Sequence, residues 1–109
     1  MATTYKVLGQ VNPSATTATT LYTVPSATQT VVSTITICNQ AATAATYRIA
    51  VRVAGSALSA EEYIVYGATV PASDATCLTV GLTLGATDVV TVYASSANLS
   101  FNLFGSEIA

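Results

Sequence analysis

The sequence predicts an all-β protein, a single antiparallel β-sandwich of about eight short strands, immunoglobulin-like or jelly-roll-like, over residues 1–109. Thr and Val are abundant, and both favour pleated structure because their side chains are stiff at χ1. Apolar and polar residues alternate in several short segments, and turn residues separate these segments about every 8 to 12 positions. A chain of 109 residues can bury one modest core and is too short for two.

The first two strands are predicted at residues 5–11 and 19–24, because turn residues close each segment. An Asn-Pro-Ser turn follows the first and a Pro-Ser-Ala turn follows the second. Residues 12–20, which overlap the first two positions of the second segment, are compositionally simple, and we expect either an extended arm or a loop there.

The clearest alternation occurs in residues 30–39 and 45–53. One face of the first segment carries Val31, Ser33, Ile35 and Ile37, and one face of the second carries Tyr47, Ile49, Val51 and Val53. Because only residues 40–44 separate the two segments, we expect an antiparallel hairpin.

The remaining strands are predicted at residues 63–70, 77–84, 89–94 and 98–104. In 77–84, one side carries Leu78, Val80, Leu82 and Leu84; in 98–104, Leu99, Phe101 and Leu103 alternate with Ser100 and Asn102. Residues 55–62 are predicted as a loop with room for no more than a helical turn.

Charge is scarce: the chain has three basic and five acidic residues, a net charge of −2, and neither His nor Trp. Nucleic-acid binding through phosphate neutralisation is not expected, because the basic groups are missing. No apolar run reaches the ~18 residues of a membrane-spanning helix. The N-terminal residues lack a basic segment followed by an apolar stretch, so we expect synthesis and folding in a cytoplasm.

The sequence offers no catalytic, cofactor-binding or metal-binding constellation. Without His, the Ser-His and Cys-His nucleophile pairs are unavailable, and the glycines do not form a phosphate-binding loop. Glu61 and Glu62 are interpreted as solvated surface rather than as an acid/base pair or calcium ligands. Asp74 and Asp88, each just before a predicted strand, are expected to accept local backbone donors.

Two cysteines lie in predicted strands. We expect Cys38 and Cys77 to be reduced, because reducing compartments keep thiols so, and to pack as small buried hydrophobes. The alternative is a disulfide or pairing between subunits.

Arg48, Arg52, Tyr5 and Phe104 are the candidate interface residues. Arg48 and Arg52 share the polar face of one strand, about 13 Å apart. They are either a solubilising stripe or protection of an edge strand, or they contact a partner's carboxylates. Phe104 is predicted to point away from the core, and the tyrosines, Tyr5 among them, must divide between inside and outside. Apolar surface with so little charge indicates contact with other protein subunits, including further copies of the chain.

Several strand segments resemble small structural proteins of tailed bacteriophages. The segments are LYTVP (21–25), VVSTITICN (31–39), TYRIAV (46–51) and NLSFNLFG (98–105). The loop 40–44 departs from the glycine-containing loops expected in that pattern. The resemblance supplies no site residues.

The resemblance implies a non-enzymatic virion component without a cofactor, most simply a decoration (cement) protein on the head shell. Its partners would be further copies of itself and the major capsid protein or other virion proteins, with no nucleic acid or membrane. The alternatives are a tail- or fibre-associated virion protein and a carbohydrate-binding host-attachment module.

Overall fold

The computed structural model describes residues 2–79 and 81–109 and confirms an all-β sandwich. The strands are β1 (Thr3–Val11), β2 (Thr19–Thr23), β3 (Gln29–Asn39), β4 (Ala45–Arg52), β5 (Tyr63–Val70), β6 (Ala75–Leu78), β7 (Leu82–Leu84), β8 (Val89–Ala94) and β9 (Leu99–Ile108). Two short 3₁₀ turns, η1 (Val53–Gly55) and η2 (Ala60–Glu62), lie between β4 and β5. All strand pairs are antiparallel.

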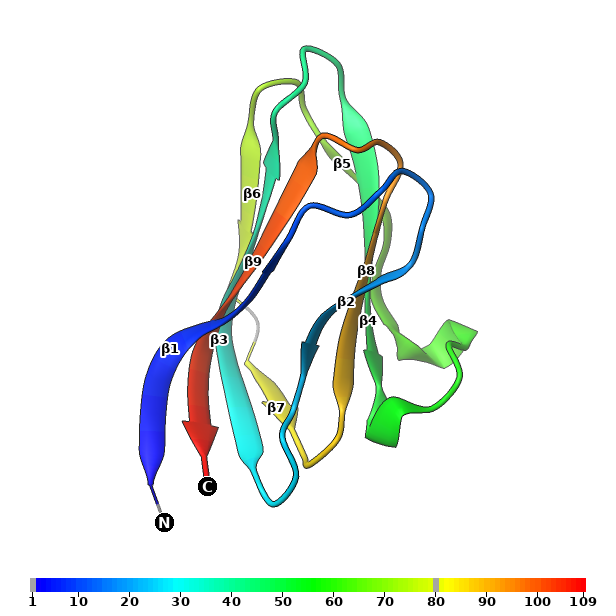
Figure 1. The fold of residues 1–109 in the computed structure, drawn as a ribbon. Helices are drawn as coiled ribbons and strands as arrows, with labels where there is room; N and C mark the ends of the chain where they lie inside the picture. Colours follow the sequence, from blue (N-terminus) through cyan, green and yellow to red (C-terminus); the bar gives the residue numbers. More distant parts are fainter. Residues whose placement is uncertain (1, 80) are drawn as a thin grey trace.

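Two sheets pack face to face (Figure 1). The five-stranded sheet has the order β1-β9-β3-β6, with β7 also paired to β3. The four-stranded sheet has the order β2-β8-β4-β5. Residues 12–18 connect β1 to β2, and the backbone N–H of Thr16 donates to the carbonyl of Ala94 at 2.8 Å.

The predicted hairpin of residues 30–39 and 45–53 is wrong. β3 pairs with β9, β6 and β7, whereas β4 pairs with β5 and β8, so residues 40–44 pass from one sheet to the other. Both strands turn an apolar side toward the same core from opposite sheets. Alternation identifies such a side but does not say whether the next strand lies beside it or across the core.

The predicted strand 77–84 is also wrong, because β6 and β7 are separate strands that pair with different parts of β3. Val80, predicted on its apolar side, lies outside the described residues. The short loop 55–62 contains η2, and Val53, predicted on the buried side of its strand, begins η1 and is 65% exposed.

A β-bulge at Ser33 changes the buried face of β3. Val32 pairs with Gly105 and Thr34 with Phe104, which leaves Ser33 as the extra residue. Before the bulge Val32 is buried and Val31 is 40% exposed, the reverse of the predicted face; after it, Ile35 and Ile37 are buried as predicted.

The core fills the space between the sheets. Its fully buried members include Val24, Val32, Ile35, Ile37, Ile49, Val70, Val90, Val92, Leu99, Phe101 and Leu103. Tyr47 of β4 meets Phe101 of β9 edge to face across the sheets, with ring centroids 6.3 Å apart. The predicted alternation of Leu99, Phe101 and Leu103 is confirmed, and β9 itself runs on to Ile108, with all residues after Leu103 half-buried.

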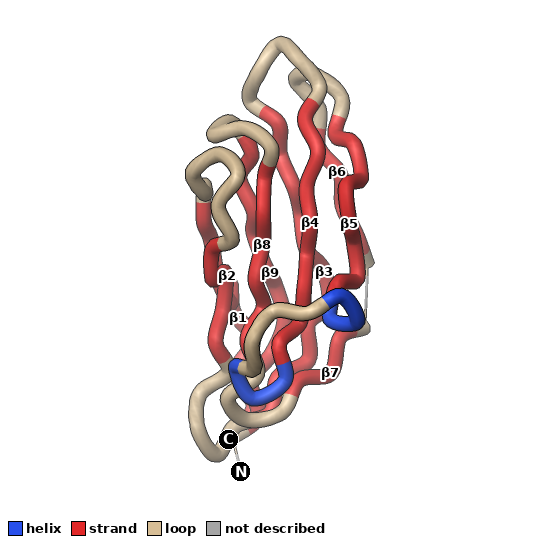
Figure 2. Tube along the Cα trace, turned by 90° about the vertical axis from the view of Figure 1, so that its right-hand side faces the viewer, coloured by secondary structure: helices blue, strands red, loops and turns tan. Residues whose placement is uncertain are grey.

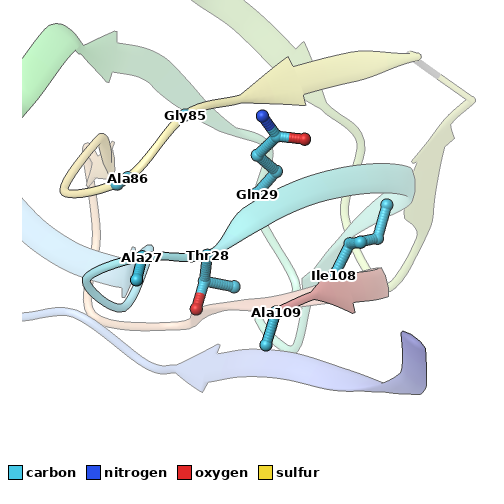
Figure 3. Close-up of a pocket in the computed structure, with 7 residues that line it drawn as sticks. All are labelled: Ala27, Thr28, Gln29, Gly85, Ala86, Ile108 and Ala109. Carbon is cyan, nitrogen blue, oxygen red and sulfur yellow. The ribbon is translucent and has the colours of Figure 1, made fainter. Parts of the chain in front are cut away.

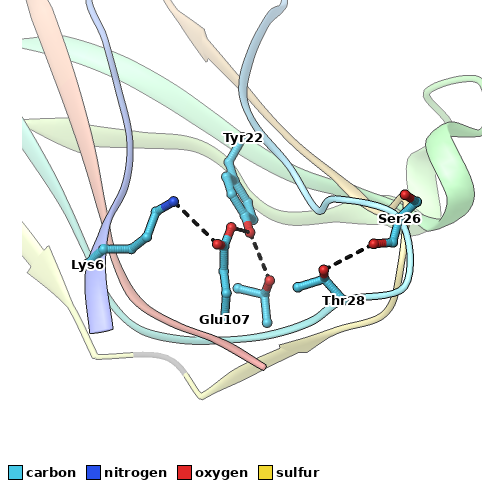
Figure 4. A network of polar contacts seen from close by, with 6 residues as sticks. Lys6, Tyr22, Ser26, Thr28 and Glu107 are labelled. Atoms are coloured by element: carbon cyan, nitrogen blue, oxygen red, sulfur yellow. Dashed lines mark hydrogen bonds and ion pairs between the residues drawn. The ribbon is translucent and has the colours of Figure 1, made fainter. Parts of the chain in front are cut away.

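A polar network bridges the sheets at the end where the chain termini lie (Figure 4). The Tyr22 hydroxyl of β2 donates to Glu107 Oε2 of β9 at 2.5 Å and lies 2.8 Å from Thr30 Oγ1. Lys6 Nζ is 3.3 Å from Glu107 Oε1. Burial, followed by the hydrogen bond to Glu107, raises the pKa of Tyr22 to about 12. The Tyr22 hydrogen bond, with Lys6, lowers the pKa of Glu107.

Candidate functional site

The candidate interface residues divide between the two outer surfaces of the sandwich. Tyr5 and Phe104 lie on the outer face of the five-stranded sheet, here called the five-strand face. Arg48 and Arg52 lie on β4, which belongs to the four-stranded sheet, whose outer surface is called the four-strand face.

Apolar side chains cover one half of the five-strand face. Tyr5 of β1 lies opposite Ser106 of β9, which lies opposite Val31 of β3, and Val7 lies opposite Phe104 in the next row. Directly opposed residues of antiparallel strands project from the same face. Tyr5 is 84% exposed, Val7 46% and Val31 40%, and Phe104 is half-buried. These side chains form one continuous uncharged patch.

Polar but uncharged side chains cover the other half of the five-strand face. The next two rows contain Gln10, Asn102, Thr36, Cys77, Ser100, Cys38 and Ala75. Gln10 Nε2 donates to Asn102 Oδ1 at 2.7 Å. Because no charge occupies the described positions of these rows, this half of the face can be covered by protein without removing an ion from water.

The prediction of buried cysteines is wrong for Cys77, which is exposed because the outer side of the edge strand β6 faces solvent, while Cys38 is half-buried. Both thiols are free. The register pairs Cys38 with Ala75 and Thr36 with Cys77, so the cysteines are diagonal neighbours on adjacent strands.

Arg48 is held between two tyrosine rings on the four-strand face. It lies directly opposite Tyr66 of β5 on one side and Tyr93 of β8 on the other. Its guanidinium carbon is 4.2 Å from the centroid of each ring. Tyr63 packs edge to face on Tyr66, with centroids 4.9 Å apart. Two cation–π contacts therefore hold the Arg48 guanidinium in place on the outer side of the sheet.

Arg52 has a different role from Arg48. Its Nε donates to the carbonyl of Ser56 at 2.6 Å and its Nη2 to the carbonyl of Gly55 at 3.0 Å. The Asp88 carboxylate accepts the backbone N–H groups of Ala54 and Gly85, which agrees with the predicted turn role. Arg52 and Asp88 thus hold the 53–56 turn against the sheet.

The segment with η1 and η2 crosses the outer side of the four-stranded sheet near its end (Figure 2). Beside it lies a groove of about 530 Å³, lined by Leu58, Ser59, Ala60, Tyr63 and Tyr66. Glu62, interpreted from sequence as solvated surface, accepts the backbone N–H of Ser59 at 3.0 Å and the Ser56 hydroxyl at 2.6 Å. Glu62 therefore stabilises the border of the groove.

A second hollow, of about 350 Å³, lies where residues 27–29 and 85–86 approach the C-terminus (Figure 3). Apart from Thr28 and Gln29, its lining side chains are aliphatic or absent, and none is ionisable. These side chains include no carboxylate, imidazole, thiol or amine.

Within residues 2–79 and 81–109, no group of three or more His, Cys, Asp or Glu residues is placed to hold a metal ion. In the same residues, no helix is long and apolar enough to cross a membrane. Sequence reasoning named Arg48 but missed Tyr66 and Tyr93 as its neighbours. Their residue type was visible, but their position beside Arg48 depends on the order of the strands.

Comparisons with protein-family models, with curated proteins and with solved structures gave no match. The chemistry of the two outer faces is therefore the basis for a functional proposal.

Proposed function

We propose that this protein is a non-enzymatic structural component of a virion: a decoration (cement) protein that stabilises a head shell by protein–protein contacts and associates with itself. The observation that carries the proposal is the uncharged five-strand face with Tyr5, Val7, Val31 and Phe104 at one end. The resemblance of the strand segments to structural proteins of tailed phages supports the same role.

Covering this face would supply a large stabilisation. An interface of standard size buries about 1,600 Å² in total, somewhat more than half of it apolar. At about 25 cal/mol per Å² of apolar area this gives roughly 20 kcal/mol before the costs of association are subtracted. Repetition over a symmetric shell multiplies the effect without any catalytic group.

The test uses a phage whose genome encodes this chain. Its heads are assembled without the protein, and binding of the purified protein to these heads is measured. Val7→Lys places a cation in the apolar half of the five-strand face, and Val53→Lys makes the same change on η1 at the opposite sheet. We expect the wild type and Val53→Lys to co-sediment with heads and to raise the temperature at which they release DNA. Val7→Lys should lose both effects; equal binding by all three proteins would contradict the proposal.

The carbohydrate-binding alternative rests on a different surface, the groove with Tyr63 and Tyr66. Sugars stack on open aromatic faces, and Tyr66 already contacts both Arg48 and Tyr63. Glycan-array binding abolished by Tyr66→Ala would favour this alternative over the shell role. Electron microscopy of labelled particles separates a head location from a tail or fibre location.

A further inference from the structure

Neither arginine of the four-strand face pairs with a carboxylate of the described residues, and Arg48 has no hydrogen-bonded partner among them. Lys6 pairs with Glu107, and Arg52 donates to two carbonyl groups of its neighbouring turn. In the described part of the chain, no carboxylate lies within 4 Å of the Arg48 guanidinium. The rings of Tyr66 and Tyr93 each lie 4.2 Å from its guanidinium carbon, and a guanidinium carries N–H donors in a fork that suits a carboxylate. Because the rings already fix the side chain, little rotamer freedom remains to be lost on binding.

A carboxylate stands at the border of the same face. Glu61 lies on η2, between Ala60 and Tyr63, both of which line the groove. Its side chain is exposed and has no cation within 4 Å among the described residues. The Ser59 side chain hydrogen-bonds the Glu61 carboxylate and lowers its pKa. The neighbouring Glu62 is engaged through both of its oxygens, which accept the Ser56 hydroxyl and the Ser59 backbone N–H.

Exposed large apolar side chains occur on β5 and on the segment before it. Tyr66 is 65% exposed, Ile64 43% and Leu58 37%, and all three lie on β5 or on the segment leading into it. The raised η1–η2 segment occupies one end of the four-strand face (Figure 2). The Arg48 row lies on the paired strands β5, β4 and β8. A two-fold axis between these regions would place the raised segment of each copy over the open part of the other.

We propose that the protein forms a two-fold dimer through the four-strand face, in which Arg48 of each copy pairs with Glu61 of the other. The inference deepens the self-association included in the proposed function. A standard interface needs about 800 Å² from each copy. One face therefore suffices, since the chain exposes 5404 Å² in all. The five-strand face then stays free for a shell.

Sedimentation velocity of the purified protein over a range of concentrations tests the dimer. We expect a dimer for the wild type, and dissociation constants about a hundredfold higher or more for Arg48→Glu and for Glu61→Arg, because each single change creates two like-charge contacts by symmetry. An equimolar mixture of the two variants should recover the dimer, since both contacts between unlike copies are then attractive. Asp74→Arg, which changes the net charge as Glu61→Arg does, should remain dimeric.

Folding of each variant is checked by circular dichroism and thermal melting. Glu61 is exposed, so Glu61→Arg keeps the fold even where Arg48→Glu, which loses two ring contacts, is destabilised. A wild-type monomer at millimolar concentration would overturn the inference, as would a folded Glu61→Arg protein that dimerises like the wild type. Failure of the mixture to associate while both variants are folded would also overturn it.

Head binding by the same proteins separates this inference from the proposed function. A monomeric wild type that still binds heads would leave the shell role standing and remove the dimer. If the wild type is a dimer, Glu61→Arg is a monomer and neither binds heads, the dimer stands and the shell role is removed.

Discussion

Removing the Tyr22 hydroxyl should destabilise the sandwich strongly, although the change deletes one atom. Tyr22→Phe loses a hydrogen bond to the Glu107 carboxylate, and such charge-assisted bonds contribute about 1.5–3 kcal/mol. It also leaves the hydroxyl of Thr30, which is fully buried, without this partner. We expect the free energy of unfolding at pH 7 to fall by about 2–3 kcal/mol, which lowers the melting temperature by roughly 10 °C for a domain of this size.

The same network predicts how stability depends on pH. The folded-state pKa of Tyr22 is raised from 10.0 to about 12. The contribution of Tyr22 to the free energy of unfolding is therefore complete below pH 10 and is lost as the pH rises through about 12. A shift of about two units corresponds to roughly 3 kcal/mol. The pKa of Glu107 is lowered from 4.5, so its contribution is present above pH 4.5 and is lost as the pH falls below that value.

Urea unfolding of the wild type and Tyr22→Phe between pH 3 and pH 11.5 measures both effects. The matched control is Tyr47→Phe, because Tyr47 is equally buried but no described group hydrogen-bonds its hydroxyl. At pH 7 we expect Tyr47→Phe to stay within about 0.5 kcal/mol of the wild type. The difference in the free energy of unfolding between the wild type and Tyr22→Phe should become smaller below pH 4.5 and above pH 10. Equal stability of the two phenylalanine variants at pH 7 would refute the reasoning.

Three further predictions concern the rest of the sandwich. Cys77 should react with a maleimide faster than Cys38, because only Cys77 is exposed, and peptide mass spectrometry after partial labelling gives the order. Gly105→Ala should lower the free energy of unfolding, measured in urea, by about 1–3 kcal/mol, since the new Cβ would overlap the β3 backbone. Gly81→Ala, with open space around its Cβ, should leave that free energy nearly unchanged. Asp88→Ala should cost about 1–2 kcal/mol and speed proteolysis of the 53–62 segment, because two backbone N–H groups lose their acceptor.

The extent of some strands was predictable from the sequence, where it depends on local patterns. The predicted strands 63–70 and 89–94 coincide with β5 and β8, and turn chemistry marks their ends. Leu99, Phe101 and Leu103 alternate with polar residues over a regular stretch, so their buried face was also predictable. In each case the signal lies within about ten residues of chain.

Two kinds of error arose where distant residues decide the structure. The bulge at Ser33 lies where β3 passes Gly105 of β9, at which a side chain would collide with the β3 backbone. Pairing with a part of β9 more than seventy positions away, and not the local pattern, therefore decides which of Val31 and Val32 is buried. The division of the predicted strand 77–84 into β6 and β7 likewise reflects separate pairing with two parts of β3.

Arg48 and Arg52 show why the candidate site was only half predictable. They are four residues apart on one strand, and the sequence treats them as equivalent. Their neighbours make them different. Arg48 lies between two tyrosines because β4 runs between β5 and β8. Arg52 instead donates to the carbonyl of Ser56, because the chain turns back there. Knowledge of that one strand order would have separated an arginine available to a partner from one that holds a loop, because cross-strand neighbours on one face interact directly.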